Sequence, residues 1–535
     1  MRNLQLPGRS PVRSPNAMAS TSHPLSTQAA LDILKKGGNA LDAAVAASAV
    51  QCVVEPGSTG IGGDCFCLYS KGGSTDLVAY NGSGRAPLAA NADWFKEHGI
   101  AEIPRQSPHS VTIPGAVDAW DRLVRDHGRL SLGEILQPAI DYARNGYPIT
   151  SRVAVDMESQ TERLAKSKNA ARVFLKDGKT PTEGSLHHQK ALADSLEKIA
   201  TEGRDAFYTG EIARDIVSYL QELGGLHTME DFKIATGEYV TPIQTDYRGH
   251  TLYECPPNGQ GVIALMLMKI MDGFDSAEDL KGTDPITLER MHQEIEAGRL
   301  AYQDRNFFLC DTAKKDMPLD WMLSDTHIDE LRTSINPAHS NRPMPKFTAP
   351  NHQSTVYITV VDEDRNCCSF INTVFETFGS VLMAPKSGIM LQNRGQGFTL
   401  DPDHPNCIEG GKRPLHTIIP GMLAKGGRIV MPFGVMGGQY QAFGHMQFLT
   451  RLLDFGLDIQ QAMDAPRFFT DPYSDITEVE ETVPEEIILA LKTLGHEIEV
   501  AKRPIGGSQA IWIDWAQGVL TAGSDPRKDG CAMGY

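Results

Sequence analysis

The sequence lacks any unbroken apolar run of about 18 residues, the length that a membrane-spanning helix requires, although 41% of its 535 residues are hydrophobic. The first twenty residues include arginines but no apolar segment of the kind found at the centre of a secretory signal. We therefore expect a cytoplasmic protein without a membrane span.

The sequence also has fewer basic than acidic residues. The chain has 50 Lys and Arg against 67 Asp and Glu, which gives a net charge of −17. Binding to nucleic acids depends on clustered Lys and Arg that neutralise phosphates. We therefore expect no nucleic-acid partner.

Several familiar catalytic and metal-binding motifs are missing. The nine cysteines include no Cys-x-x-Cys pair, and neither His-Glu-x-x-His nor Gly-x-Ser-x-Gly occurs, so no zinc site, disulfide framework or serine-hydrolase elbow is indicated. The glycine-rich segment 60–64 precedes a predicted strand, whereas a phosphate-binding loop must open a helix. We expect no metal and no cofactor.

What the sequence does contain is a segment of strict alternation. Apolar residues occupy every second position of residues 356–360, and hydroxyl-bearing residues fill the positions between them from Thr355 to Thr359. A period of two predicts a strand with one apolar face and one hydroxyl-bearing face.

A polar turn at 362–366 and a second predicted strand follow this segment. If the turn forms the loop of a hairpin, Val361 lies opposite Cys367, and counting back places Thr355 opposite Thr373. Directly opposed residues hold their Cβ atoms roughly 4.5–5.5 Å apart, so the two threonines should touch. An ordinary buried hairpin explains the same pattern.

The rest of the chain predicts a mixed α and β protein. Residues 1–22 are rich in Ser, Pro and Arg and predict a loosely docked arm. The segment 334–353 has the composition of a linker and ends just before Thr355. Helices are predicted over 23–36, over 40–54 with Asn39 as its cap, and over 262–271 and 442–455.

The order of short motifs resembles that of the γ-glutamyltransferase family of N-terminal-nucleophile hydrolases, from about residue 20 to the C-terminus. The family nucleophile is a Thr that opens a strand ending in Val-Val-Asp, as Thr355 does here, and its hydroxyl partner aligns with Thr373. The family's oxyanion-binding glycine pair aligns with Gly437 and Gly438. The motifs that carry the resemblance are 23–28, 111–115, 296–305, 387–395, 411–417, 433–439, 462–468 and 523–530.

The resemblance implies an α+β fold, a four-layer αββα sandwich, made by a precursor that cleaves itself between Ser354 and Thr355. The large chain would comprise residues 23–354 after the arm, and the small chain residues 355–535. Cleavage turns the amide of Thr355 into an α-amine, which titrates near 8 and can act as a base for the neighbouring hydroxyl. The resemblance leaves open a homo-oligomer of processed heterodimers.

The residues that bind the α-carboxylate and α-amine of glutamate in this family are replaced in this sequence. The position of the carboxylate-binding Arg holds a serine, with Arg85 two residues later. The amine-binding Asn aligns with Phe375 and the amine-binding Asp with Gly397. The family's Ser-Ser pair aligns with His416 and Thr417. Without the Asp, a buried ammonium would be unpaired and disfavoured.

Arg85, Arg394 and His416 remain as groups that can hold an anionic acyl group. We therefore expect an amidohydrolase or acyltransferase acting on a small acyl group that bears a carboxylate and no α-amine, similar to the acylase-like and oxamate-amidohydrolase-like branch. Three alternatives stay open: a true γ-glutamyltransferase or glutathione hydrolase, an unprocessed scaffold protein without activity, and a purely structural role for Arg85 and Arg394.

Overall fold

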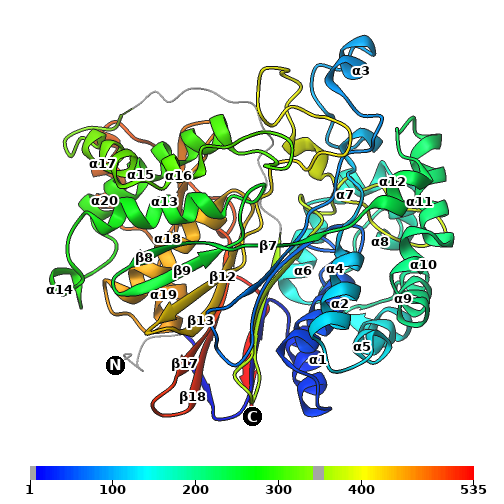
Figure 1. The fold of residues 1–535 in the computed structure, drawn as a ribbon, viewed down its shortest axis with the longest axis horizontal. Coiled ribbons are helices and arrows are strands. Elements are labelled where there is room, and N and C mark those ends of the chain that lie inside the picture. The colour runs from blue at the N-terminus through cyan, green and yellow to red at the C-terminus, as the bar shows by residue number, and fades with distance from the viewer. Residues whose placement is uncertain (1–7, 342–354) are drawn as a thin grey trace.

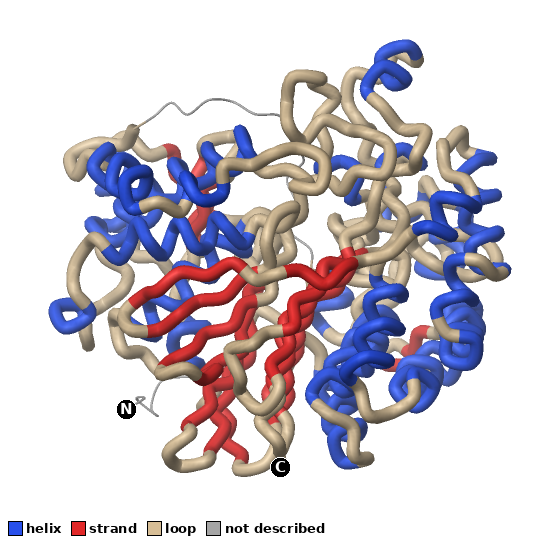
Figure 2. The backbone as a smooth tube through the Cα atoms, viewed as in Figure 1, coloured by secondary structure: helices blue, strands red, loops and turns tan. Residues whose placement is uncertain are grey.

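The computed structural model describes residues 8–341 and 355–535. Two seven-stranded antiparallel sheets pack face to face, and helices cover both outer faces (Figures 1 and 2). A core of apolar side chains lies between the sheets, and a further core lies between each sheet and its helices. The expected α+β, four-layer αββα sandwich is confirmed.

The two sheets are built from distant parts of the chain. The first runs in the order β1 (Val12–Ser14), β18 (Val519–Ser524), β17 (Gly507–Asp514), β13 (Arg428–Met436), β12 (Gly421–Lys425), β9 (His250–Glu254), β8 (Ile243–Tyr247). The second runs in the order β19 (Cys531–Gly534), β2 (Met18–Thr21), β10 (Val356–Val361), β11 (Cys367–Thr373), β3 (Asp64–Ser70), β4 (Val78–Gly82), β7 (Glu238–Val240).

Helices from two parts of the chain form the outer layers (Figure 1). The layer on the second sheet contains α1 (Pro24–Lys35), α2 (Ala40–Val54), α4 (Ala116–His127), α5 (Leu132–Asn145), α9 (Lys190–Glu202) and α11 (Glu211–Glu222). The layer on the first sheet contains α13 (Gly261–Asp272), α15 (Leu288–Phe308), α17 (Asp325–Ser334), α18 (Tyr440–Leu453) and α20 (Glu485–Thr493).

Shorter elements complete the fold. They are α3 (Ala92–Glu97), α6 (Ser151–Glu158), α7 (Thr161–Ala165), α8 (Lys168–Phe174), α10 (Arg204–Tyr208), α12 (Met229–Ile234), α14 (Ala277–Leu280), α16 (Leu319–Met322), α19 (Ile459–Asp464), η1 (Pro108–Ser110), η2 (Arg394–Gly397), β5 (Tyr147–Pro148), β6 (Leu186–His187), β14 (Phe468–Thr470), β15 (Ile476–Val479) and β16 (Glu497–Val500).

The alternating segment forms β10 with the predicted register. Val361 pairs with Cys367 and Val356 with Asn372, and the same count places Thr355 across from Thr373. The predicted cap of α2 is also confirmed, since the Asn39 side chain accepts hydrogen bonds from the first turn of that helix. Both features depend on residues close in sequence.

Both faces of β10 are buried. Ile358 and Val360 pack towards the helices, while Tyr357 lies in the core between the sheets. The hydroxyls of Thr359 and Ser369 donate to backbone carbonyls of β13, each over 3.3 Å. Burial of the hydroxyl face is tolerated because the opposite sheet supplies acceptors for it.

The structure differs from the expected loose arm over much of residues 1–22. Residues 12–14 form β1 at the edge of the first sheet, and residues 18–21 form β2 inside the second. The backbone of β2 pairs with β10 on one side and β19 on the other, which supplies the hydrogen bonds that anchor it. Of the predicted linker, residues 342–353 lie outside the described residues, as does Ser354.

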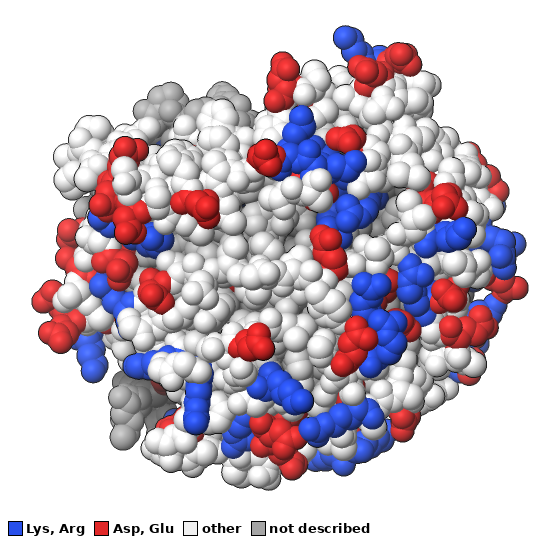
Figure 3. Space-filling view, viewed as in Figure 1, with Lys and Arg blue, Asp and Glu red and all other residues white. Residues whose placement is uncertain are grey.

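No helix among the residues that the structure describes is long and apolar enough to cross a membrane. On the face of the molecule shown in Figure 3, acidic and basic side chains are interspersed.

Candidate active site

Thr355 lies at the entry to β10 and is 1% exposed. The period of the strand places its side chain on the same face as Tyr357, which packs between the sheets. There the amide Nε2 of Gln441 donates to the Thr355 hydroxyl oxygen over 3.4 Å. The hydroxyl therefore faces the first turn of α18, which belongs to the opposite half of the sandwich.

Two further hydrogen bonds, one from the side chain and one from the backbone, position Gln441. Its Oε1 accepts from the backbone N–H of Ile419 over 3.2 Å, and its own backbone N–H donates to the carbonyl of Gly438 over 3.3 Å. The side chain is fully buried. The sequence analysis missed this residue; the signal for it was its place in the first helical turn after the glycine pair.

Gly437 and Gly438 form the turn between β13 and α18, as predicted. Their φ angles are +128° and +60°, a region that favours glycine. A Cβ on Gly437 would lie 2.9 Å from the Cα of Gly506. The carbonyl of Gly438 accepts from Gln260 Nε2 over 3.2 Å, which fixes the turn from the side of α13. The turn is tight, and Gly438 contacts Gln441, the residue that donates to the Thr355 hydroxyl.

Thr373 ends β11, and its hydroxyl oxygen accepts from the backbone N–H of Phe375 over 3.0 Å. Phe375 itself has a φ of +78°, a region that a bulky residue rarely adopts. The bond from Thr373 helps to hold this turn, and the turn presents the ring of Phe375 to Arg394.

Arg394 is a fully buried cation with few polar contacts among the described residues. Its guanidinium lies 3.9 Å from the ring centroid of Phe375, and Nη1 donates to the hydroxyl of Thr417 over 3.1 Å. Nε and Nη2 have no hydrogen-bond partner among the described residues. Burial lowers the pKa of Arg394 to about 9, while the charge of Asp64 acts in the opposite direction. An anion that accepted from Nε and Nη2 would satisfy this group.

His416 is occupied by other contacts. Its Nδ1 accepts from the backbone N–H of Ile418 over 3.3 Å, so the neutral ring carries its proton on Nε2, which lies 3.1 Å from Asp64 Oδ2. Burial, together with the charge of Arg394, lowers the pKa of His416 to about 4. The residue is therefore neutral near pH 7, and its contact is with Asp64, whereas the sequence analysis expected it to help hold an anionic acyl group.

Asp64, which the sequence analysis did not single out, links several of these groups. Its Oδ1 accepts from the backbone N–H of Gly84 over 2.9 Å and from Gln392 Nε2 over 2.8 Å. Its Oδ2 contacts His416. Both oxygens therefore already accept hydrogen bonds from groups of the protein.

Arg85 already has partners within the protein. Its side chain is 29% exposed, lies 3.6 Å from Asp311 and donates to the carbonyl of Gly411 over 3.1 Å. Burial and the nearby charge of Arg413 lower its pKa, and Asp311 opposes that shift. Of the two arginines proposed to bind an anion, the structure places only Arg394 beside Phe375 and Thr417.

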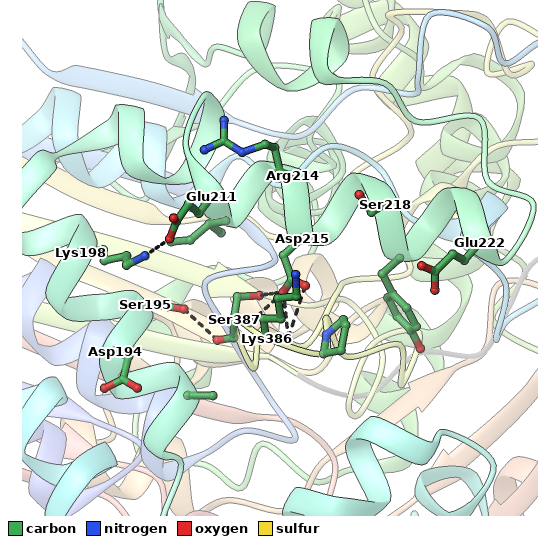
Figure 4. A pocket seen from close by; sticks show the side chains of 14 residues that line it. Asp194, Ser195, Lys198, Glu211, Arg214, Asp215, Ser218, Glu222, Lys386 and Ser387 are labelled. Atoms are coloured by element: carbon green, nitrogen blue, oxygen red, sulfur yellow. Dashed lines mark hydrogen bonds and ion pairs between the residues drawn. The ribbon is translucent and has the colours of Figure 1, made fainter.

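A separate cavity of about 510 Å³ lies between α9, α11 and residues 385–387 (Figure 4). Asp215 accepts from the hydroxyl of Ser387 over 2.8 Å, and Lys198 pairs with Glu211 at its edge. None of the residues that the sequence analysis proposed as catalytic or substrate-binding lines this cavity. It is therefore distinct from the candidate active site.

Comparisons with protein-family models and with known proteins identify relatives along nearly the whole chain. The family model described as Gamma-glutamyltranspeptidase matches residues 26–535. The glutathione hydrolase-like YwrD proenzyme of Bacillus subtilis (strain 168) is 39% identical, over 97% of this chain and 98% of that protein. The oxamate amidohydrolase proenzyme of Klebsiella pneumoniae subsp. pneumoniae is 32% identical, over 98% of this chain and 99% of that protein.

Among solved structures, the cephalosporin acylase from Bacillus halodurans matches with a TM-score of 0.92 and 38% identity, covering 100% of this chain and 99% of that chain. The family match extends over nearly the whole length, and the four-layer sandwich is the fold that the resemblance implied. The chain belongs to the γ-glutamyltranspeptidase family of N-terminal-nucleophile hydrolases.

Proposed function

We propose that this protein is a self-processing amidohydrolase that uses Thr355 as its nucleophile and takes an acyl group bearing a carboxylate. Two buried features support the proposal, and Gln260 links their surroundings, because its Nε2 donates to the carbonyls of Thr417 over 2.9 Å and Gly438 over 3.2 Å. One is the Thr355 hydroxyl under Gln441. The other is the guanidinium of Arg394, with two donors that lack a partner among the described residues.

In the processing step, the Thr355 hydroxyl oxygen attacks the carbonyl carbon of Ser354. The new C–O bond replaces the C–N bond, and the nitrogen of Thr355 takes up the proton that the hydroxyl gives up and becomes an amine. Water then hydrolyses the ester, which leaves a carboxylate on Ser354 and restores the hydroxyl. The products are a large chain that ends at Ser354 and a small chain that begins at Thr355.

In the catalytic step, the α-amine of Thr355 accepts the hydroxyl proton as the oxygen attacks the substrate amide. The new C–O bond of an acyl-enzyme replaces the C–N bond, the departing amine takes up that proton, and water then hydrolyses the ester to release the acid and restore the hydroxyl. An α-amine titrates near 8, so a useful fraction is neutral at physiological pH. The amide of Gln441 donates to the same oxygen, which favours its partly charged form in the transition state. The backbone N–H groups of Gly437 and Gly438 are the proposed oxyanion donors; losing one such donor typically costs about 10²–10³ in rate.

Substrate preference follows from the charges around Arg394. Nε and Nη2 of Arg394 offer a carboxylate two donors, while Phe375 forms an apolar wall beside them. An α-ammonium would need an anion, yet Asp64 already uses both of its oxygens and His416 is neutral. An acyl group with a carboxylate and no amine therefore fits best, in keeping with the relative named oxamate amidohydrolase.

Hydrolysis of γ-glutamyl amides is the second candidate, because the relative that is 39% identical is named glutathione hydrolase-like. The two candidates differ by one amino group on the acyl chain. We expect glutaryl-p-nitroanilide to be turned over with a higher kcat/KM than γ-glutamyl-p-nitroanilide. Equal or better use of the γ-glutamyl compound would refute the proposed preference.

The number of polypeptide chains in the purified protein distinguishes an inactive scaffold from both candidate enzymes. We expect purified protein to give two bands on a denaturing gel, with Thr355 as the N-terminal residue of the smaller chain. A single full-length band after prolonged incubation would favour an unprocessed scaffold.

A further inference from the structure

Two histidines and one glutamate converge in a buried position outside the candidate active site. His292 and Glu296 lie one turn apart on α15, and His496 lies in the turn between α20 and β16. One donor atom from each residue lies within 4.8 Å of the others, and all three side chains are buried. The third residue is 204 positions away from the first, so no local motif could have revealed the group.

His292 is arranged as a metal-binding histidine would be. Its Nε2 lies 2.7 Å from the backbone carbonyl of Asn336. A carbonyl only accepts, so Nε2 carries the proton and Nδ1 of the neutral ring presents a lone pair. Metal-bound histidines commonly donate their second ring N–H to a carbonyl in this way. The lone pair accepts a hydrogen bond from Nε2 of His496, 2.7 Å away, so a metal ion that bound both nitrogens would displace this proton, which could move to Nδ1 of His496.

Glu296 supplies a carboxylate beside the histidine pair, nearest to Nδ1 of His496 and not to the Nε2 that faces His292. Its Oε1 lies 3.8 Å from His496 Nδ1 and accepts from the hydroxyl of Ser340 over 3.1 Å. Its Oε2 accepts from the backbone N–H of Asn341 over 3.1 Å. Arg299 Nε is 3.7 Å from Glu296 Oε1, but Nη2 of that arginine pairs with Asp475 at 2.6 Å. Part of the positive charge nearby is therefore balanced by Asp475.

We propose that His292, Glu296 and His496 bind one divalent transition-metal ion of the zinc type. Two imidazoles and one carboxylate are a donor set that Zn²⁺ takes in proteins, with a fourth position left for water. With bonds of about 2.0–2.1 Å in tetrahedral geometry, the two imidazole nitrogens must separate to about 3.3 Å. This is a small shift from their present 2.7 Å. Coordination would also require the Glu296 carboxylate to move towards Nε2 of His496.

The ligands come from both sides of the cleavage site that we propose. His292 and Glu296 precede Ser354, whereas His496 follows Thr355. A bound ion would therefore join the large and small chains through coordination bonds. It would also fix the residues that contact its ligands, Asn336, Ser340 and Asn341, which lead towards the cleavage site. Metal binding itself does not depend on cleavage, so the site can be tested whether or not the proposed function holds.

The test is a titration of EDTA-treated, full-length purified protein with Co²⁺, followed by displacement with Zn²⁺. We expect one equivalent of Co²⁺ to bind with the visible absorption bands of a tetrahedral site, and Zn²⁺ to abolish them. His292→Gln and His496→Gln should each weaken binding by more than the roughly 10–100-fold that loss of an outer partner costs. His327→Gln is the matched control, because this buried histidine pairs with Asp304 of the same helix α15 but lies outside the ligand set.

The wild-type protein alone can overturn the proposal. Failure to take up one equivalent of Co²⁺ would identify the group as a hydrogen-bonded histidine pair only. Strong near-ultraviolet absorption from cobalt–thiolate bonds would place the ion on cysteines instead. As a second readout, Zn²⁺ should raise the unfolding temperature of the wild type, because it binds the folded state. An equal rise in His496→Gln would show that the ion binds elsewhere.

Discussion

Replacing Arg394 with methionine tests the proposed substrate preference most directly. The change removes the guanidinium whose Nε and Nη2 have no partner among the described residues. In the free enzyme this cation is already buried, so binding a substrate carboxylate requires no further removal of water from the arginine. Loss of one partner from a buried, hydrogen-bonded charge pair typically costs about 2–5 kcal/mol. This corresponds to a fall in kcat/KM of roughly 30-fold to several thousand-fold for a carboxylate-bearing acyl group.

The assay compares two substrates of similar size, glutaryl-p-nitroanilide and valeryl-p-nitroanilide, which lacks the carboxylate. Arg394→Met should lose activity towards the first and retain or improve activity towards the second. Arg85→Met is the matched control, since Arg85 is partly exposed and paired with Asp311; we expect its ratio of the two activities to match that of the wild type.

Stability separates a binding role from a structural role for Arg394. A buried charge with unmet donors costs folding free energy, and an apolar residue of similar volume at such a site is often neutral or stabilising. We therefore expect the unfolding temperature of Arg394→Met to match or exceed that of the wild type. Equal loss of both activities, or a selective loss in Arg85→Met, would refute the reasoning.

Three further predictions concern the nucleophile and its surroundings. Thr355→Ala should remain one full-length chain without amide turnover, because the variant lacks the hydroxyl proposed to attack both the carbonyl of Ser354 and the substrate; a cleaved or active variant on a denaturing gel or in the amidase assay would contradict this. Gln441→Leu should lower kcat by roughly 5–30-fold, since a hydrogen bond to a reacting group contributes about 1–2 kcal/mol; Gln447→Leu, also buried in α18, is the control, and equal effects would argue against a catalytic contact. His416 has its pKa lowered to about 4, below its unfolded value of about 6.5, so its contribution to stability is complete above pH 6.5 and is lost as the pH falls towards 4. In His416→Asn, the free energy of unfolding should therefore decline less steeply over that interval, by about 1.4 kcal/mol per pH unit, and an unchanged slope in denaturant titrations would contradict the assignment.

The sequence by itself determined the features that depend on neighbouring residues. The alternation in residues 356–360 and the length of the turn at 362–366 set the register of β10 and β11, because a shift by one residue would reverse every side chain. The cap at Asn39 and the turn at Gly437 and Gly438 are likewise local, since they depend on backbone geometry within a few residues.

Only the tertiary structure decided which charged groups are paired. Arg85 and Arg394 were equivalent candidates in the sequence, yet one meets Asp311 and the other lies buried against Phe375. The contact between Gln441 and Thr355 joins residues 86 positions apart. The partner of a side chain depends on how distant elements pack, and periodicity and spacing carry no information about that packing.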